Sequence, residues 1–574
     1  MRCGNKFVSL PISNFLCLLC ILLLTACSTG LGEPISKQKG PVSQQVFRWA
    51  FALPDILSFD PGVATDITSL NAIKLVFTGL VDLDDALHVK PQLAQSYEVS
   101  ADGLTYTFHL RAATHFSDGT LLTSSDVAYS IDRALSPEVN QQSGVALTYL
   151  GLVYAAQERT TGKVKTIIGS GLLTPDPTTL VIKLSKATPY FLQTLTYPTS
   201  YVVEKKVIDQ WGGRWTDHLA DNDGQGGAGP FKVLAYDHSK GMRLVANPAY
   251  YGSKPQLQEI DYLSYKDVNT SFNAYLANQT DLTGIPLSQY SLVKSRPDFG
   301  RNDALTIFYI GMNYLVKPLD NIHIRQALSA ALDREVVVKV AWHDAFTPTC
   351  HIVPAGMFGY NPDATCAHGL GIHGDKTLAR QLFARGLQEE GLTLQTFPQL
   401  TLTYPSQNPE VANEATTEVQ LWKSVLGITI NTATMSQNSL YTAQQQTVGN
   451  SGPLQMWSAG WGADYPDPQD FITLQFGANA PNNAYNFGNN ANPSASSQRD
   501  LQRQMAQADT MNDTTARAQT YHKIEQQVLD QVGWLTIYQR PSLYLLKLYV
   551  TGLKVNSASL VPSDDWARVY IAEH

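Results

Sequence analysis

Residues 400–430 read LTLTYPSQNPEVANEATTEVQLWKSVLGITI, and their pattern indicates the class of the fold. Leu400 to Tyr404 is typical of a strand, and apolar residues then recur at helical spacing. The members of this apolar stripe are Val411, Ala415, Val419, Trp422 and Leu426. Gly427 suits the position after a helix end, and Ile428 to Ile430 begins a second strand. This order predicts a right-handed strand–helix–strand crossover, and therefore a parallel sheet covered by helices.

Local signals elsewhere agree with an α/β fold. A strand is expected over 46–52 and a helix that ends near Gly79. Asp102-Gly103 between alternating segments predicts a hairpin, and Thr123 with Asp126 predicts a capped helix start. A further helix face is predicted from Ile324, Ala327, Leu328, Ala331 and Leu332. A chain of 574 residues normally forms more than one core, so we expect at least two lobes.

The N-terminus has the pattern of a secretory signal. Arg2 and Lys6 precede an apolar run, FLCLLCILLL at 15–24, which is shorter than the roughly 20 residues needed to span a bilayer. The sequence LTAC at 24–27 resembles the bacterial lipobox, which implies cleavage before Cys27 and a diacylglycerol on its sulfur. The predicted segments are a signal peptide at 1–26 and a lipidated flexible stalk at 27–44. An uncleaved anchor helix is the alternative.

The charge of the chain excludes one class of partner. Loss of residues 1–26 would leave 548 residues and change the formal charge from −8 to −10, because two basic residues and no acids are removed. This acidity argues against nucleic acid, whose phosphates require basic surfaces. The 27 tyrosines and 9 tryptophans, with only 16% charged residues, suit hydrogen bonding and stacking on a polar organic ligand.

The cysteines that remain after cleavage suggest a disulfide. Cys3, Cys17 and Cys20 belong to the signal and Cys27 is the predicted lipidation site, which leaves Cys350 and Cys366. In an oxidising compartment two cysteines more often form a disulfide than a metal site, for which two ligands are too few. A disulfide that closes this loop would contribute about 3 kcal/mol.

No pattern of a catalytic or metal centre stands out. The chain has neither a G-x-S-x-G motif nor an H-E-x-x-H pair, and the histidines are scattered. We therefore expect a protein that is not an enzyme and that uses no metal and no cofactor.

Residues 456–468, MWSAGWGADYPDP, form the one segment that suggests a ligand site. Trp457 and Trp461 beside glycines would make a flat wall, and Asp464 just beyond could pair with a cation. A carboxylate that meets an enclosed ammonium forms a charge-assisted hydrogen bond worth about 1.5–3 kcal/mol. The alternative is that Trp457 packs in a core and that Asp464 or Asp467 caps a turn. The local chemistry alone leaves both open.

Over nearly its whole length the chain resembles family 5 of the solute-binding proteins, the dipeptide- and oligopeptide-binding lipoproteins of ABC importers. The resemblance rests on an ordered series of short motifs, each weak singly. They are LVFTGL at 75–80, PQLAQSY at 91–97, FHLR at 108–111, FSDGT at 116–120, SDV at 125–127, GAGPF at 227–231, NPAYY at 247–251, RQAL at 325–328 with DR at 333–334, and WKSVLGI at 422–428. Two residues depart from the family pattern. Ala228 stands in place of a threonine and Gly488 in place of a frequent asparagine.

The resemblance implies a two-lobed periplasmic-binding-protein-like fold (type II, cluster C) with an extra inserted subdomain. The first lobe would comprise 45–80, 201–307 and 529–574, the inserted subdomain 81–200 and the second lobe 308–528. The lobes would close on the ligand about a hinge.

The resemblance also implies which residues bind. Asp464 matches the aspartate that holds the α-ammonium of a peptide, and Trp461 matches a tryptophan of the pocket wall. Tyr538 stands where members place pocket tyrosines, and Trp457 and Tyr465 complete the predicted ligand-binding residues.

The implied function is capture of short peptides and their delivery to an ABC permease in the membrane, by a monomer anchored through Cys27 on the outer face of the cell membrane or in the periplasm. One alternative is the same fold with another solute, such as an oligosaccharide or a nickel chelate. A second is a secreted hydrolase with Asp464 and Asp467 as paired carboxylates.

Overall fold

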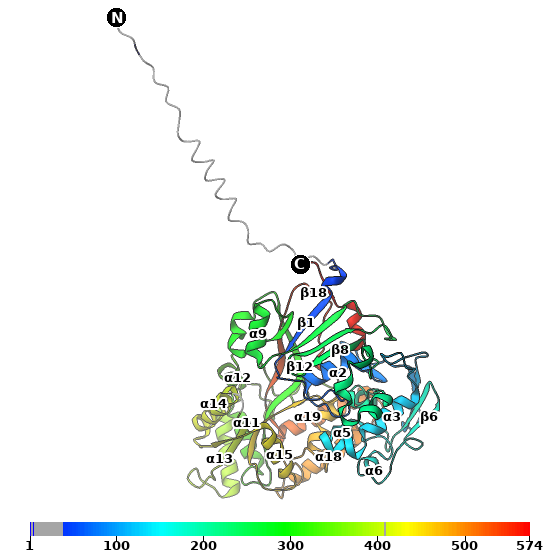
Figure 1. Ribbon diagram of the computed structural model, residues 1–574. Helices are drawn as coiled ribbons and strands as arrows, with labels where there is room; N and C mark the ends of the chain where they lie inside the picture. The colour runs from blue at the N-terminus through cyan, green and yellow to red at the C-terminus, as the bar shows by residue number, and fades with distance from the viewer. Residues whose placement is uncertain (2–3, 5–37, 407–408) are drawn as a thin grey trace.

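The computed structural model describes residues 1, 4, 38–406 and 409–574 (Figure 1). The predicted signal peptide, apart from residues 1 and 4, lies outside the described residues, and so do Cys27 and the first part of the predicted stalk. Among the helices of the described chain, none combines the length and the apolar character that crossing a membrane would require.

One sheet of eleven strands passes through most of the molecule. Ten of them follow the order β15-β14-β16-β12-β17-β11-β1-β10-β9-β8, and β13 pairs with β17. Their bounds are β1 (Val46–Phe51), β8 (Phe231–Asp237), β9 (Gly241–Ala246), β10 (Glu259–Ser264), β11 (Leu282–Gly284), β12 (Phe299–Met312), β13 (Thr347–Pro348), β14 (Thr401–Pro405), β15 (Asn431–Met435), β16 (Met456–Gly462) and β17 (Leu535–Leu546).

The two longest strands, β12 and β17, join the halves of this sheet. They are antiparallel neighbours. At one end of the pair β17 also pairs with β11, and at the other end β12 also pairs with β16. Their own pairing is interrupted between Asp303 opposite Pro541 and Ile307 opposite Gln539. Three residues of β12 there face only Arg540, a β-bulge of the kind that bends a strand.

The second lobe is built on the β15-β14-β16 end of the sheet. As predicted, helix α14 connects two parallel strands, β14 and β15, and Trp422 on its apolar stripe is fully buried. The second strand starts at Asn431, three residues later than Ile428, because the ladder with β14 begins only there. The helices of this lobe are α11 (Ile322–Ala330), α12 (Arg334–Trp342), α13 (Lys376–Glu390), α14 (Pro409–Leu426), α15 (Gln437–Thr447), α16 (Pro468–Phe471), α17 (Thr473–Phe476), α18 (Ala495–Ala508) and α19 (Thr514–Asp530).

A separate four-stranded sheet, in the order β4-β5-β7-β6, forms an insert with a hydrophobic core of its own. The predicted hairpin is formed by β4 and β5, with Gly103 at φ +69° in its turn, and the capping box of Thr123 and Asp126 begins α3. The elements are β4 (Ala94–Val99), β5 (Thr105–Leu110), β6 (Leu172–Asp176), β7 (Thr179–Lys183), α3 (Ser124–Ala134), α4 (Pro137–Ser143), α5 (Val145–Leu150), α6 (Ala156–Thr160) and α7 (Phe191–Thr194).

The first lobe surrounds the β1-β10-β9-β8 end of the large sheet, and a third core fills it. In Figure 1 it lies above the other two parts, with the helices α11–α15 on one side below it and α3, α6 and β6 on the other. Its remaining elements are α2 (Ile67–Val76), β2 (Val81–Leu83), β3 (Val89–Pro91), α8 (Lys205–Trp211), α9 (Val268–Leu276), α10 (Leu287–Val293), β18 (Val550–Thr551) and β19 (Tyr570–Ile571). Short 3₁₀ helices occupy Val42–Gln44, Pro198–Ser200, Gly212–His218, Asp221–Asp223, Ala367–Gly369 and Ser563–Arg568. The domain limits given under Sequence analysis stay a prediction.

Cys350 and Cys366 are joined by a disulfide in the second lobe. Close by, the carboxyl group of Glu525 on α19 accepts hydrogen bonds from the backbone N–H groups of Ile352 and Val353, both at 2.9 Å. This contact ties the segment after Cys350 to α19.

Two glutamates on α14 are buried in the second lobe, although glutamate is rarely found in a core. Glu414 accepts hydrogen bonds from the indole of Trp342 at 2.9 Å and the hydroxyl of Tyr538 at 3.1 Å. One turn later, neither carboxyl oxygen of Glu418 has a partner among the described residues. Burial raises the pKa of Glu414 to about 7, and burial together with the nearby Glu414 raises the pKa of Glu418 well above its ordinary value.

These groups make stability depend on pH. Above pH 5 the unfolded chain carries both glutamates ionised, whereas the folded protein still holds protons on them. The folded state binds more protons, so the free energy of unfolding falls as pH rises from about 5 through 7 and beyond. In Glu418→Gln we expect the loss of stability between pH 5 and pH 8 to be smaller than in the wild type, because one of the two groups with a raised pKa is removed.

Urea unfolding at the two pH values measures this difference. Glu158→Gln, at an exposed glutamate, is the matched control and should lose as much stability as the wild type. An equal loss in Glu418→Gln and the wild type would contradict the prediction.

Candidate functional site

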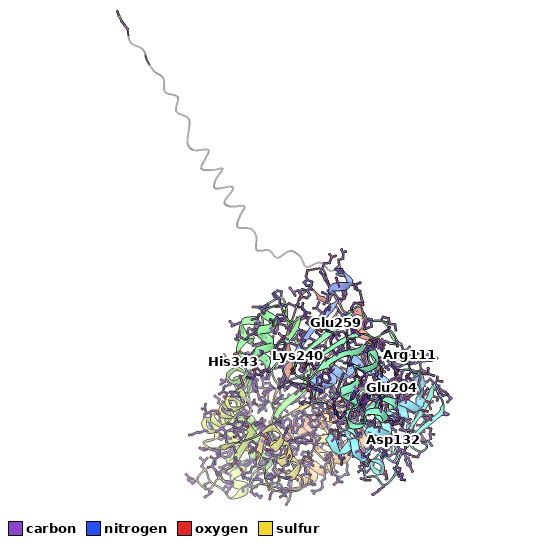
Figure 2. The ribbon with its side chains drawn as sticks, in the orientation of Figure 1. Arg111, Asp132, Glu204, Lys240, Glu259 and His343 are labelled. Carbon is purple, nitrogen blue, oxygen red and sulfur yellow. A yellow bond between two sulfur atoms is a disulfide. The ribbon has the colours of Figure 1, made fainter. Side chains whose placement is uncertain are left out.

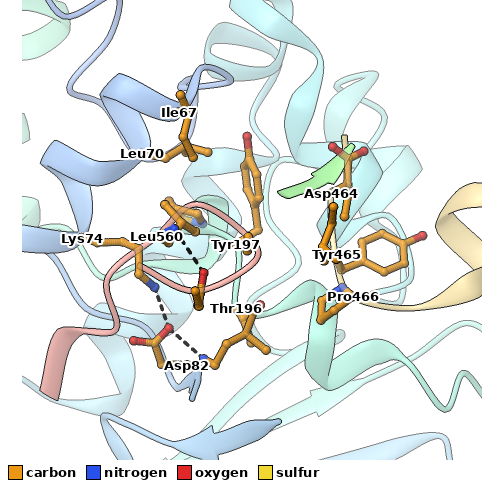
Figure 3. Close-up of a pocket in the computed structure, with 16 residues that line it drawn as sticks. Ile67, Leu70, Lys74, Asp82, Thr196, Tyr197, Asp464, Tyr465, Pro466 and Leu560 are labelled. Carbon is orange, nitrogen blue, oxygen red and sulfur yellow. Dashed lines mark hydrogen bonds and ion pairs between the residues drawn. The ribbon is translucent and has the colours of Figure 1, made fainter. Parts of the chain in front are cut away.

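A recess lies where the first lobe, the insert and the second lobe meet (Figure 3). Figure 3 shows Ile67 and Leu70 of α2 on one side and Asp464 to Pro466 on the other. The full lining consists of Ile67, Leu70, Lys74, Asp82, Leu83, Thr196, Tyr197, Pro198, Leu305, Ala463, Asp464, Tyr465, Pro466, Asn556, Ala558 and Leu560. All three parts of the chain therefore contribute to one site.

The pairing of β16 with β12 brings Asp464 to this recess. The ladder ends with Gly462 opposite Thr306, and the backbone N–H of Ala463 then donates to the carbonyl of Leu305 at 2.8 Å. Leu305 lies in the interrupted stretch of β12 between the two lobes. The chain consequently leaves the second lobe at the junction, and Asp464 is the second residue beyond the strand.

The carboxylate of Asp464 is half-buried and lacks a cationic partner among the residues that the structure describes. Burial raises its pKa to about 6, while hydrogen bonding from the hydroxyl of Tyr149, which belongs to the insert, acts in the opposite direction. No lysine, arginine or histidine within 38–406 and 409–574 forms an ion pair with it. A carboxylate in such a place is unfavourable alone and is stabilised by a cation that enters from outside.

Aromatic rings of the insert surround the segment. Tyr149 stacks on Tyr197 with ring centroids 3.6 Å apart, and Tyr190 stacks on Tyr465 at 5.6 Å. Burial raises the pKa of Tyr149 and of Tyr197 far above neutrality, so both hydroxyls stay protonated. Tyr465 thus belongs to the second lobe by sequence and packs into the core of the insert.

Asp467 has a structural role. Its carboxylate receives two hydrogen bonds from the guanidinium of Arg517 on α19, each at 2.7 Å, and both side chains are buried. One of its oxygens also accepts the backbone N–H of Gln469 and so caps α16. This bears out for Asp467 the alternative considered under Sequence analysis, a cap at a turn.

The remaining predicted ligand residues separate into two groups. Trp461 is half-buried, two residues before the lining residue Ala463, and its indole donates to the carboxyl group of Asp470 at 3.3 Å. Trp457 is fully buried in the core of the second lobe, where it stacks on Tyr485 at 5.5 Å. Tyr538 is also fully buried, with its ring 5.0 Å from Phe308 and its hydroxyl bonded to Glu414. None of these three residues lines the recess, and the strands that carry Trp457 and Tyr538 direct both side chains into that core.

On the first-lobe side of the recess the charges are already paired. The ammonium of Lys74 lies 2.6 Å from Asp82 and 2.7 Å from the hydroxyl of Tyr201, and both ionic side chains are buried (Figure 3). This pair leaves Asp464 as the charge of the recess that lacks a counter-ion among the described residues.

Possible metal ligands are found only on the surface of the described chain. Asp333, Glu335 and His373 lie within reach of one another, and Asp333 already caps α12. The histidines of 323–351 do not converge. His323 bonds to Glu389, His351 contacts Tyr360 and His343 ends α12 at the position labelled in Figure 2.

Sequence reasoning missed Tyr149, Tyr197 and Asp470. The two tyrosines lie about 300 positions from Asp464 in the chain, in segments without a recognisable motif. Asp470 follows the MWSAGWGADYPDP segment by two residues, and a carboxyl group so close to a suspected site was a signal that could have been used.

Comparison with known proteins gives a consistent set of matches. Residues 88–483 match the family described as bacterial extracellular solute-binding proteins, family 5 Middle. The oligopeptide-binding protein OppA of Bacillus subtilis is 28% identical over 537 residues, which cover 91% of this chain and 93% of that protein.

Two solved structures show the same fold. The unliganded open form of the periplasmic murein tripeptide-binding protein MppA has a TM-score of 0.74 and 22% identity, covering 94% of this chain and 98% of its own. Haemophilus influenzae OppA in complex with RPPGFSPFR has a TM-score of 0.69 and 22% identity, covering 94% of this chain and 100% of its own.

The ion pair beneath the site gives a prediction about stability. Arg517→Met leaves the carboxylate of Asp467 buried and unpaired, which should lower the free energy of unfolding by about 3–5 kcal/mol. Urea unfolding measures the loss. Arg503→Met, at an exposed arginine that pairs with Asp500, is the matched control and should change stability little. Equal stability of the two variants would show that the buried pair does not hold this region together.

Proposed function

The chain belongs to family 5 of the bacterial extracellular solute-binding proteins, and on this premise we propose that it captures short peptides outside the cytoplasm and delivers them to the permease of an ABC importer. The ligand would be held between the lobes, with its free amino end on Asp464.

The observation that carries the proposal is the unpaired carboxylate of Asp464 in the recess between the lobes. A peptide has one group that every sequence shares at its start, the α-ammonium, which is positively charged at neutral pH. Its charge complements Asp464, while the hydroxyl of Tyr149 occupies part of the hydrogen-bonding capacity of the carboxylate. The half-buried indole of Trp461 would stand beside the bound amino end. The names of the relatives, which refer to oligopeptides and a tripeptide, point to the same class of ligand.

The interrupted pairing of β12 and β17 suits a hinge. Ladder hydrogen bonds are missing where three residues of β12 face Arg540, so less structure has to be broken when the strands bend there. Opening about this point would separate Asp464 and Tyr465 from Tyr149 and Tyr190 of the insert, and would admit a ligand to the recess.

The rival functions fit the site less well. A hydrolase with paired carboxylates would need Asp467, whose oxygens are both engaged by Arg517. The family itself consists of binding proteins. An oligosaccharide or another neutral solute could donate hydroxyl groups to Asp464 but would bring no cation to neutralise its charge.

We place the protein at the outer face of the cell membrane or in the periplasm, anchored as a monomer through acylated Cys27. The LTAC sequence and the family's extracellular character support this part of the proposal. Mass spectrometry of the N-terminal peptide from cells tests it, since an unmodified Met1 on the mature protein would rule it out.

Replacement of Asp464 tests the peptide site. Asp464→Asn removes the charge and keeps the shape, so affinity for peptides with a free amino end should fall about ten- to hundredfold while folding is retained. Calorimetry with peptides that co-purify with the protein measures the change. Asp500→Asn, at an exposed aspartate of α18, is the control and should bind as the wild type does. Unchanged affinity in Asp464→Asn would remove this residue from the site.

The raised pKa of Asp464 predicts a pH dependence of binding. The carboxyl group loses its charge as pH falls through about 6, whereas the peptide ammonium, with an ordinary pKa of about 7.7–8.0, stays charged up to about pH 7. The groups around it, Tyr149, Tyr197 and Tyr465, are neutral in this window, and Asp470 is the other acid nearby. Affinity should therefore be highest near pH 7 and decrease below pH 6, by up to about tenfold per pH unit.

Calorimetric titrations between pH 5 and pH 7, where the peptide ammonium stays charged, follow this change. Asp464→Asn should show a flat profile over the same range. A wild-type affinity that rises on acidification would contradict the assignment of a negative charge to the site.

A further inference from the structure

Asp470 is a buried acid that lies directly behind the recess. It is the third residue of α16, and its side chain is fully buried. One carboxyl oxygen, Oδ2, accepts two hydrogen bonds, from the backbone N–H of Asp464 at 3.0 Å and from the indole N–H of Trp461 at 3.3 Å. The same atom thus contacts the two residues on which the ligand site depends.

The other oxygen of this carboxyl group, Oδ1, has no partner among the described residues. Burial, and next the negative charge of Asp464, raises the pKa of Asp470 well above its ordinary value. Asp470 therefore gives up its proton less readily than an exposed aspartate. In the protonated form, its carbonyl oxygen would accept both N–H groups without adding a second negative charge beside Asp464.

Contacts within the second lobe fix the position of Asp470. Asp467 caps the helix that carries Asp470, and the two-fold contact between Asp467 and Arg517 fixes that cap to α19. The side-chain amide of Gln475 donates to the backbone carbonyl of Asp470 at 3.4 Å. A chain of contacts thus runs from the body of the second lobe to the recess.

We propose that Asp470 is the positioning residue of the ligand site: its Oδ2 holds the backbone of Asp464 and the indole of Trp461 so that the carboxylate of Asp464 faces the recess. This inference rests on the proposed function, since it assigns the support of the ammonium-binding carboxylate. A binding group has to be held within about 0.5 Å of its productive position, and hydrogen bonds from a rigid element provide that precision.

Three variants separate this role from its rivals. Asp470→Ala removes the acceptor, Asp470→Asn keeps an acceptor oxygen and cannot carry a charge, and Asp464→Asn removes the binding charge itself. Asp500→Ala, at an exposed aspartate of the same lobe, is the matched control. Thermal unfolding of each variant first establishes the temperature range over which it is folded.

The readout is the preference for a free amino end. Each folded protein is incubated with an equimolar mixture of random peptides three to five residues long, half of them N-acetylated, and the captured peptides are counted by mass spectrometry. The ratio of free to acetylated peptides measures contact with the ammonium and is independent of how stable the folded protein is. Fluorescence emission of the tryptophans reports any change around Trp461.

We expect a ratio well above one for the wild type and the Asp500→Ala control, and near one for Asp464→Asn. In Asp470→Ala the ratio should fall about tenfold, and the tryptophan emission should shift. Asp470→Asn should restore most of the wild-type ratio. A wild-type ratio in folded Asp470→Ala would overturn the inference, because the acid would then serve only the fold. A ratio near one in Asp470→Asn would also overturn it, because the ligand would then need the charge of Asp470 directly.

The failure of the proposed function has a different signature. If the wild type captures free and acetylated peptides equally, the ammonium is not recognised at all. The peptide-binding role of Asp464 then falls, and the role of Asp470 falls with it.

Discussion

The pairing of β16 with β12 determines where the ligand site can be. Because β12 crosses from one lobe to the other, a strand paired along it up to Thr306 must end at the junction of the lobes. The residues that follow Gly462 then have no sheet to join and turn along the boundary between three cores. Asp464 reaches the recess for this reason, and Tyr465 reaches the core of the insert.

Three aspartates at three-residue spacing illustrate how the surroundings decide what a carboxyl group does. Asp467 is neutralised by the guanidinium of Arg517 and stabilises the fold. Asp470 is buried without a cation among the described residues, which raises its pKa, and it accepts hydrogen bonds from the backbone of Asp464 and the indole of Trp461. Asp464 is only half-buried and also lacks a cation among those residues, so its charge is available to a ligand. Three buried or half-buried carboxyl groups within seven residues thus have three different surroundings. Only Asp464 is left with a charge that a ligand can neutralise.

The buried glutamates of α14 follow the same physics away from the recess. Glu414 is stabilised by an indole and a phenol, whereas Glu418 has no hydrogen-bond partner among the described residues, and burial beside the neighbouring acid raises its pKa. They lie on a helix whose spacing of apolar residues predicted its buried face correctly. Polar residues beside such a stripe can be buried with it, and a pattern of apolar positions does not reveal this.

The sequence by itself determined the local elements and the class of the fold. The stripe ending at Trp422, the turn at Asp102-Gly103 and the capping box at Thr123 each depend on residues a few positions apart, so they could be predicted from short segments. The ordered motifs indicated the family. For Asp464 the local sequence left two roles open, a carboxylate that binds a ligand and a cap at a turn. The environment of each aspartate was decided only by the tertiary structure, since Tyr149 and Arg517 come from distant segments. Trp457 and Tyr538 were placed in a core for the same reason: the side of a strand that faces a cleft is set by what packs against the sheet.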